Sequence, residues 1–231
     1  MTSSIYESGE YQGNNPDWHA TDAPFKAEWI ARLFDQNRIV PRHVVEIGTG
    51  SGEILVQLRD RYREARFEGY DISSQAYAIA AGRSADRLAF HHADYLTAQT
   101  ARPDVLMAID VFEHVEDYIG FLRAMRTRGE WKVFHIPLDL SVQGLLRGQG
   151  LMYSREVVGH LHYFFKDTAL ATLRDCGYEV LDHFYTHGAE ELPNRALRTR
   201  LFNVPRRLLR KVNEDFAVRL MGGASLMVLA R

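Results

Sequence analysis

The stretch HVVEIGTGSGEILVQL, residues 43–58, decides the fold. An apolar run carrying Glu46 leads into glycines at Gly48, Gly50 and Gly52, and an apolar stretch with helical spacing comes next. Glycines let the backbone pass close under a ligand, and the start of the following helix offers unpaired N–H groups with a partial positive charge. The stretch therefore predicts a strand, a ligand-binding turn and a helix.

On both sides of this turn, short apolar runs alternate with amphipathic stretches, which is typical of a sheet with crossover helices. We expect strands at 43–47, 66–70, 88–91, 104–109, 131–136, 178–185 and 225–230. We expect helices at 25–34, 54–62, 75–84, 118–127 and 167–176. The pattern predicts an α/β fold.

Composition narrows the class of protein further. A chain of 231 residues with 46% hydrophobic content is long enough to bury one full hydrophobic core, and its length disfavours two large domains. A net charge of −2 disfavours general nucleic-acid binding and favours a small-molecule substrate. The single Cys176 excludes an internal disulfide and a cysteine-rich metal site. No signal-like start or transmembrane-length apolar run is present, so we expect a soluble cytoplasmic protein.

The glycine spacing and one aspartate indicate the ligand. Glu53 follows Gly52, so the pattern is G-x-G-x-G and not the dinucleotide G-x-G-x-x-G, and a pyrophosphate would meet a carboxylate. Asp71 ends the second strand, where a carboxylate can accept from both hydroxyls of a ribose. It can also cap the helix beginning near Ser73, which is compatible with that role. We expect a nucleoside without a phosphate cradle.

The ordered motifs EIGTGSG, GYDIS, HHADYL and DVLMAIDVFEHV, followed by GHLHYFF and CGYEV, resemble those of the class I S-adenosylmethionine (SAM) dependent methyltransferases. The resemblance is strongest to the group that includes the ubiquinone-biosynthesis O-methyltransferases, and it covers most of the chain. It implies a Rossmann-like, doubly wound α/β sheet, mostly parallel with an antiparallel last strand. SAM would be the cofactor and a small molecule the methyl acceptor.

The resemblance also implies a set of cofactor-binding residues. Glu46 and the glycines would line the methionine end of SAM, Asp71 would hold the ribose, and Asp110 would lie under the sulfonium. The full implied set is Glu46, Gly48, Gly50, Gly52, Asp71, Ile72, Ala93, Asp94, Tyr95, Asp110 and Trp18. Ile72 would pack on the adenine, and Asp94 with its neighbours would recognise the adenine amino group.

The chain ahead of the core predicts a lid. Residues 1–37 form an arm and a helix that would close over SAM through Trp18, His19 and Lys26, although ordinary surface packing is an alternative. Residues 38–231 would form the SAM-binding core, with a helical insertion at about 187–223. That basic insertion could bind an anionic substrate, touch a membrane surface or form a homodimer face, unless it is simply a solvated helix face.

Three histidines are candidate catalytic residues. His160 and His162 follow the fifth strand and would face the acceptor, where one could act as a general base. Alternatively, one of them hydrogen-bonds the backbone and shapes the loop. His114 follows Glu113 in a segment that begins at Asp110, which could hold a metal, but a network bracing the pocket floor is favoured. We therefore expect no metal.

The acceptor is less constrained than the cofactor. The histidines favour O-methylation of a secondary metabolite, a quinone or a sugar-like molecule, whereas N- or C-methylation by the same fold stays open. A nicotinamide-dependent reductase or epimerase is disfavoured by the glycine spacing and by the absence of a Tyr-x-x-x-Lys pair, since Tyr62, Tyr70, Tyr77 and Tyr95 have no Lys four residues on. A SAM-binding protein without catalysis is the remaining alternative.

Overall fold

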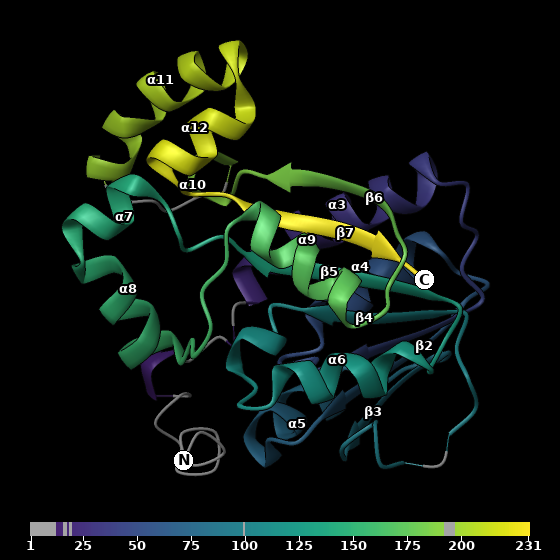
Figure 1. The fold of residues 1–231 in the computed structure, drawn as a ribbon. Coiled ribbons are helices and arrows are strands. Elements are labelled where there is room, and N and C mark those ends of the chain that lie inside the picture. The colour runs from purple at the N-terminus through teal and green to yellow at the C-terminus, as the bar shows by residue number, and fades with distance from the viewer. Residues whose placement is uncertain (1–12, 16–17, 19, 99, 192–196) are drawn as a thin grey trace.

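The computed structural model describes residues 13–15, 18, 20–98, 100–191 and 197–231, with 189 and 197–202 described by their backbone. A seven-stranded sheet in the order β3-β2-β1-β4-β5-β7-β6 forms its centre (Figure 1). The strands are β1 His43–Ile47, β2 Arg66–Asp71, β3 Leu88–His92, β4 Val105–Ile109, β5 Trp131–Pro137, β6 Val180–Thr186 and β7 Ser225–Ala230. β7 runs antiparallel to both of its neighbours and the first five strands pair in parallel, which confirms the expected topology.

Helices follow β1, β2 and β4 as the sequence predicts, whereas β3 is followed by β4 with no helix in the described part of the connection. The helices are α3 Ala23–Gln36, α4 Glu53–Arg61, α5 Ser74–Ala81, α6 Tyr118–Arg126, α7 Val142–Arg147, α8 Gln149–Tyr153, α9 Lys166–Asp175, α10 Gly188–Glu191, α11 Leu197–Val212 and α12 Glu214–Met221. A π-helical turn follows α8 over Ser154–Val158. The sequence did not indicate α7 and α8, because Gly144, Gly148 and Gly150 interrupt their apolar spacing.

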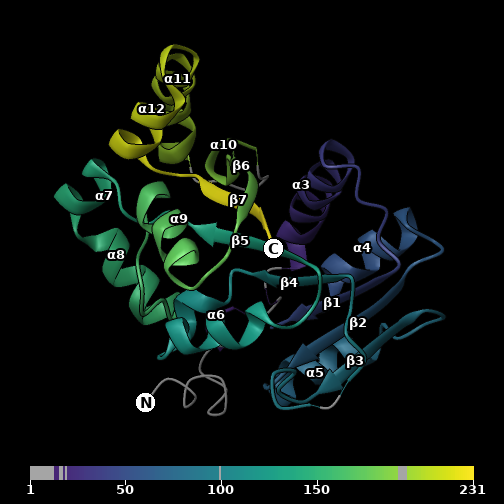
Figure 2. The same ribbon diagram turned by 45° about the vertical axis from the view of Figure 1, so that its right-hand side comes forward.

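Helices cover both faces of the sheet (Figure 2). β4 is buried along its whole length, and its side chains alternate between the two layers. Leu106 and Ala108 belong to the hydrophobic cluster with α6 and α9, whereas Val105, Met107 and Ile109 belong to the cluster with α3 and α4. Each fully buried aliphatic side chain contributes about 1.5–3 kcal/mol, so the two layers hold the sheet from both sides.

The strand order reverses at β1, which pairs with β2 on one side and with β4 on the other. Ligands of open α/β sheets bind beyond the carboxyl ends of the strands at such a switch point. Helices α7, α8 and α10–α12 gather beyond this edge (Figure 1). Within the described part of the chain, no helix has the length and apolar character needed to cross a membrane.

Candidate active site

A cavity of about 820 Å³ opens at the carboxyl edge of the strands. Its walls come from the glycine loop after β1, from the ends of β2, β4 and β5, from α3 and from the turn that follows α8. Trp18, which is buried, lines it from the N-terminal arm, whereas the predicted lid residue His19 lies outside the described residues. The volume is within the range of small-molecule sites, about 300–1,000 Å³.

The three loop glycines all have positive φ but differ in role. A Cβ at Gly50 would have Trp18 atoms no nearer than 3.8 Å, so this residue presents its backbone to the cavity. A Cβ at Gly52 would lie 2.5 Å from the Phe90 ring, so Gly52 permits close packing of α4 against the sheet. Gly48 lines the cavity and Gly52 does not. The loop thus combines a ligand-facing turn with a packing constraint.

Asp71, at the end of β2, is fixed by the backbone around the cavity. Its Oδ2 accepts a hydrogen bond from the N–H of Gly50 at 2.9 Å, and its Oδ1 accepts one from the N–H of Ser73 at 2.8 Å. Burial raises the pKa of Asp71, while these two backbone bonds lower it. Ile72 beside it is exposed and also lines the cavity. The carboxylate is held in place to accept from a further donor.

Glu46 forms a second carboxyl group in the cavity wall. Its side chain is buried, and Oε2 accepts a hydrogen bond from the Thr49 hydroxyl at 2.9 Å. Burial raises the pKa of Glu46 to about 8, although the Thr49 bond and the charge of Lys26 act in the opposite direction. The group can bind a cation as a carboxylate or stay protonated near neutral pH.

Asp110, at the end of β4, has φ +55° and holds a chain of polar groups. Lys26 Nζ lies 2.7 Å from its Oδ2, and His135 Nδ1 lies 2.6 Å from its Oδ1. His135 Nε2 lies 2.8 Å from the Thr186 hydroxyl. Burial alone would raise the pKa of Asp110, but His135 and Lys26 lower it well below its usual value. Asp110 lines the cavity, and Lys26 of α3 is a cationic partner that the sequence did not connect to it.

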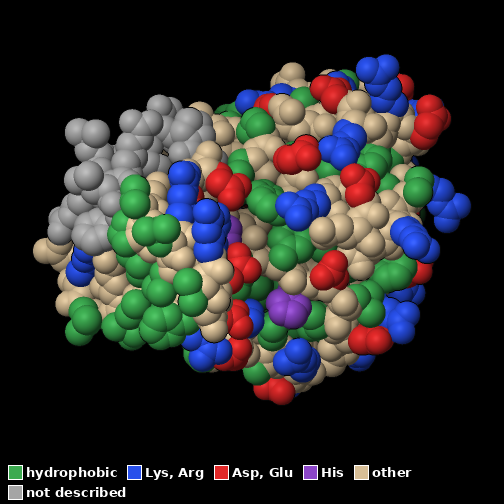
Figure 3. All heavy atoms as spheres, turned by 90° about the horizontal axis from the view of Figure 1, so that it is seen from above, with side chains coloured by type: hydrophobic (Ala, Val, Ile, Leu, Met, Phe, Trp, Pro, Cys, Tyr) green, Lys and Arg blue, Asp and Glu red, His purple; other side chains and the backbone are tan. Residues whose placement is uncertain are grey.

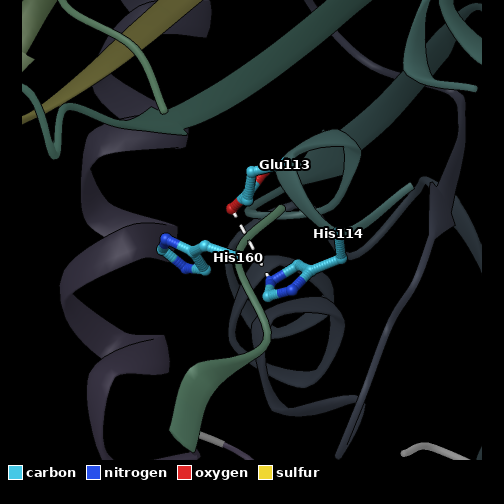
Figure 4. Close-up of side chains that lie close together, drawn as sticks. All are labelled: Glu113, His114 and His160. Carbon is cyan, nitrogen blue, oxygen red and sulfur yellow. Dashed lines mark ion pairs between the residues drawn. The ribbon is translucent and has the colours of Figure 1, made fainter. Parts of the chain in front are cut away.

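Glu113, His114 and His160 lie close together beside the cavity (Figure 4). One ligand atom from each lies within 4.8 Å of the others, so the cluster has metal-ligand spacing. The Glu113 carboxyl group is fully buried, and His114 Nε2 lies 3.8 Å from its Oε1. Burial raises the pKa of Glu113 well above its usual value. Both oxygens of the Glu113 carboxyl group are buried and make no hydrogen bond among the described residues, so the bracing network that the sequence favoured stays a prediction.

The pair formed by His160 and Asp139 was not predicted. His160 Nδ1 lies 2.6 Å from Asp139 Oδ2, and both residues line the cavity. Asp139 follows β5 by two residues, so its place just beyond a strand end was the available signal. His114 lines the cavity too, with Nδ1 3.0 Å from the Gly159 carbonyl oxygen. A carboxylate that orients one imidazole nitrogen leaves the other for a ligand.

Besides Gly52, four other residues of the predicted site do not line this cavity. His162 Nε2 lies 2.9 Å from the Val115 carbonyl oxygen, as in the alternative in which one histidine shapes the loop. Tyr95 is buried in the core beneath the sheet edge. Ala93 donates its N–H to the Asp71 carbonyl, and Asp94 Oδ1 accepts from the Leu96 N–H. Contacts of residues 93–95 with adenine remain predictions.

A family model described as a methyltransferase domain matches residues 18–183. No curated protein matches the chain. The match includes the glycine loop, Asp71, Asp110 and the His160–Asp139 pair. It therefore spans the elements that form most of the cavity.

Solved structures share the fold. The plantazolicin methyltransferase BpumL, in complex with a monoazolic desmethylPZN analogue and S-adenosylhomocysteine (SAH), has a TM-score of 0.63 at 15% identity over 99% of this chain and 92% of its own. The SAH-bound magnesium protoporphyrin IX methyltransferase from Synechocystis PCC 6803 has a TM-score of 0.60 at 13% identity, over 90% and 82%. An SAH-bound SAM-dependent methyltransferase from Geobacter sulfurreducens gives 0.59 at 17%, over 88% and 90%.

Proposed function

Because the chain belongs to the class I SAM-dependent methyltransferases, we propose that it methylates a hydroxyl group of a small molecule, with His160 as the general base. The 2.6 Å contact between His160 and Asp139 at the wall of the cavity carries this proposal. Two structural neighbours are named for magnesium protoporphyrin IX and plantazolicin, and these names also support a small-molecule methyl acceptor.

The residues of the cavity fit SAM, which supplies an electrophilic methyl group when bound. Asp71 presents a fixed carboxylate for ribose hydroxyls, and Glu46 offers a buried carboxyl group for the methionine ammonium. Glu53 lines the cavity at the start of α4, where a phosphate-binding loop would avoid a carboxylate. These groups match a nucleoside that carries an amino acid, and they do not match a pyrophosphate.

Whether the reaction needs a general base depends on which atom of the acceptor is methylated. A hydroxyl group must lose its proton as the methyl group is transferred, whereas an amine needs only to be unprotonated. Asp139 bonds His160 Nδ1, so Nε2 is the nitrogen that can accept the hydroxyl proton. The carboxylate then stabilises the imidazolium that forms, as in other carboxylate–histidine pairs. Alignment of acceptor and methyl group in the cavity supplies most of the remaining acceleration.

The test compares His160→Gln and Asp139→Asn with His162→Gln as the matched control, because His162 belongs to the same segment but does not line the cavity. Transfer of labelled methyl groups from SAM is measured on panels of phenols, alcohols and amines. We expect His160→Gln to lose about 10²- to 10⁴-fold in turnover on hydroxyl acceptors while SAM affinity is kept. Asp139→Asn should shift the pH profile of turnover.

Three results would contradict the proposal. Full activity of His160→Gln would remove the base. Activity on amines alone would change the acceptor class, and SAM binding without transfer to any acceptor would indicate a non-catalytic protein. We expect activity to survive chelation with EDTA. Loss of activity that a divalent cation restores would instead assign Glu113, His114 and His160 to a metal site.

A further inference from the structure

Exposed apolar side chains concentrate on the helices beyond the carboxyl edge of the sheet. Of the twelve large hydrophobic residues that are exposed in the described part of the chain, nine lie on α7, α8, α11 and α12. They are Val142, Leu145, Leu146, Met152, Tyr153, Val204, Leu208, Val212 and Phe216. Figure 3 shows hydrophobic side chains gathered at the end of the molecule that carries these helices, beside Lys and Arg side chains. We call this surface the helical cap.

The apolar residues of α11 form one exposed stripe. Val204, Leu208 and Val212 are four residues apart, which places them on one side of the helix, and their exposed fractions are 64%, 62% and 84%. α11 packs against α12, and α12 packs against α7. The stripe is therefore the side of α11 that the other described helices leave uncovered. Scattered exposed apolar residues are ordinary, but a clustered set marks an interaction surface.

Positive charge accompanies these apolar residues. Helices α7, α8, α11 and α12, with the turn Ser154–Val158, contain nine Lys or Arg and three Asp or Glu. The whole chain contains 28 Lys or Arg and 30 Asp or Glu, so the remainder is acidic. Arg207 and Lys211 each precede a residue of the stripe by one position, and both are exposed. Glu190 of the neighbouring α10 lies 3.1 Å from Arg207 and 3.3 Å from Arg210, so it compensates part of this charge, and the helical cap keeps an excess of basic side chains over the acidic remainder of the chain.

The acidic residues of α12 are bound to partners on neighbouring elements. Asp215 Oδ1 accepts a hydrogen bond from the Tyr185 hydroxyl at 2.7 Å and also contacts Lys166. Glu214 Oε1 lies 2.9 Å from His187 Nε2. Their negative charge is partly compensated there, so it reduces the positive potential of the cap only partly.

We propose that the helical cap binds peripherally to an anionic phospholipid membrane, with the α11 stripe in the interface and the basic side chains at the headgroups. An amphipathic basic helix with an uncovered apolar side is the type of element that lies in a membrane surface. Each Lys or Arg near such a surface strengthens binding about fivefold. A second copy of the chain fits this surface less well, because pairing two caps would bring like charges together.

The experiment measures co-sedimentation of the full chain with phosphatidylcholine vesicles that contain about one third phosphatidylglycerol or none. We expect binding to the anionic vesicles at about 0.1 M salt and strong loss of binding at about 0.5 M salt. Lys211→Glu changes the charge by two units and should weaken binding about thirtyfold. Leu208→Ser with Val212→Ser should weaken it about tenfold for each side chain.

Matched controls lie at the opposite end of the molecule. Arg63→Glu reverses an exposed charge between α4 and β2, and Val40→Ser replaces a side chain that is 82% exposed before β1. Neither should weaken vesicle binding by more than about twofold. None of these positions lines the cavity, so unchanged SAM affinity and melting temperature show that each variant is folded. The result is thus independent of whether the acceptor is a hydroxyl compound.

Three outcomes would overturn the proposal. The first is no binding to anionic vesicles at low salt. The second is an equal loss of binding in the control variants. The third is a dimer, measured by light scattering, that Leu208→Ser with Val212→Ser converts to monomer, since the stripe would then be covered by a second copy.

Discussion

Replacement of Asp71 by alanine tests the cofactor site most directly. The carboxylate accepts two backbone hydrogen bonds, from Gly50 at 2.9 Å and from Ser73 at 2.8 Å, and it faces the cavity. A hydrogen bond to a charged group contributes about 1.5–3 kcal/mol, so loss of the ribose contact should raise the Kd for SAM about 10- to 150-fold. The two orphaned N–H groups should also lower the free energy of unfolding by about 1–3 kcal/mol.

Calorimetric titration with SAM and SAH measures the first effect, and urea unfolding measures the second. Asp104→Ala is the matched control, because Asp104 also accepts hydrogen bonds from two backbone N–H groups, those of Arg42 at 2.8 Å and His43 at 2.6 Å, yet does not line the cavity. We expect its SAM affinity to change less than that of Asp71→Ala. Affinity within about twofold of the native value for Asp71→Ala, in a folded protein, would refute the assignment of Asp71 to the ribose.

Two further predictions concern stability. Burial raises the pKa of Glu46 from 4.5 to about 8, so its contribution to stability is fully present below about pH 4.5 and is lost as the pH rises through 8. The free energy of unfolding should fall by about 1.4 kcal/mol per pH unit between these values, and Glu46→Gln should remove that slope in urea unfolding. Gly52→Ala should destabilise the protein by about 2–4 kcal/mol, because its Cβ would lie 2.5 Å from Phe90 at positive φ. Gly50→Ala should cost about 1–2 kcal/mol, and the reverse order of melting temperatures would contradict this account.

The order of the strands and helices could be predicted from the sequence, because each element follows from the spacing of apolar residues that are close together in the chain. Strand β1 was predicted with its observed bounds, and the other core strands and helices were predicted to within a few residues. Asp71 could be proposed as the ribose-binding residue because a strand end and a glycine turn define where its carboxylate lies. The reductase alternative had only the general α/β pattern in its support, and the match to a methyltransferase domain removes it.

The sequence by itself determined the sheet and the glycine turn, since periodicity and glycine spacing act over a few residues. Its ordered motifs resembled the family, and the cofactor residues that this resemblance implies remain predictions. Only the tertiary structure decided that Lys26 reaches Asp110, that Asp139 orients His160, and that His162 bonds a backbone carbonyl instead. It also left one side of α11 uncovered. These contacts join residues that are at least 21 positions apart in the sequence, so no local pattern specifies them. The pKa of Asp110 depends on the tertiary structure in the same way, because burial raises it and the His135 and Lys26 side chains that the fold places beside it lower it.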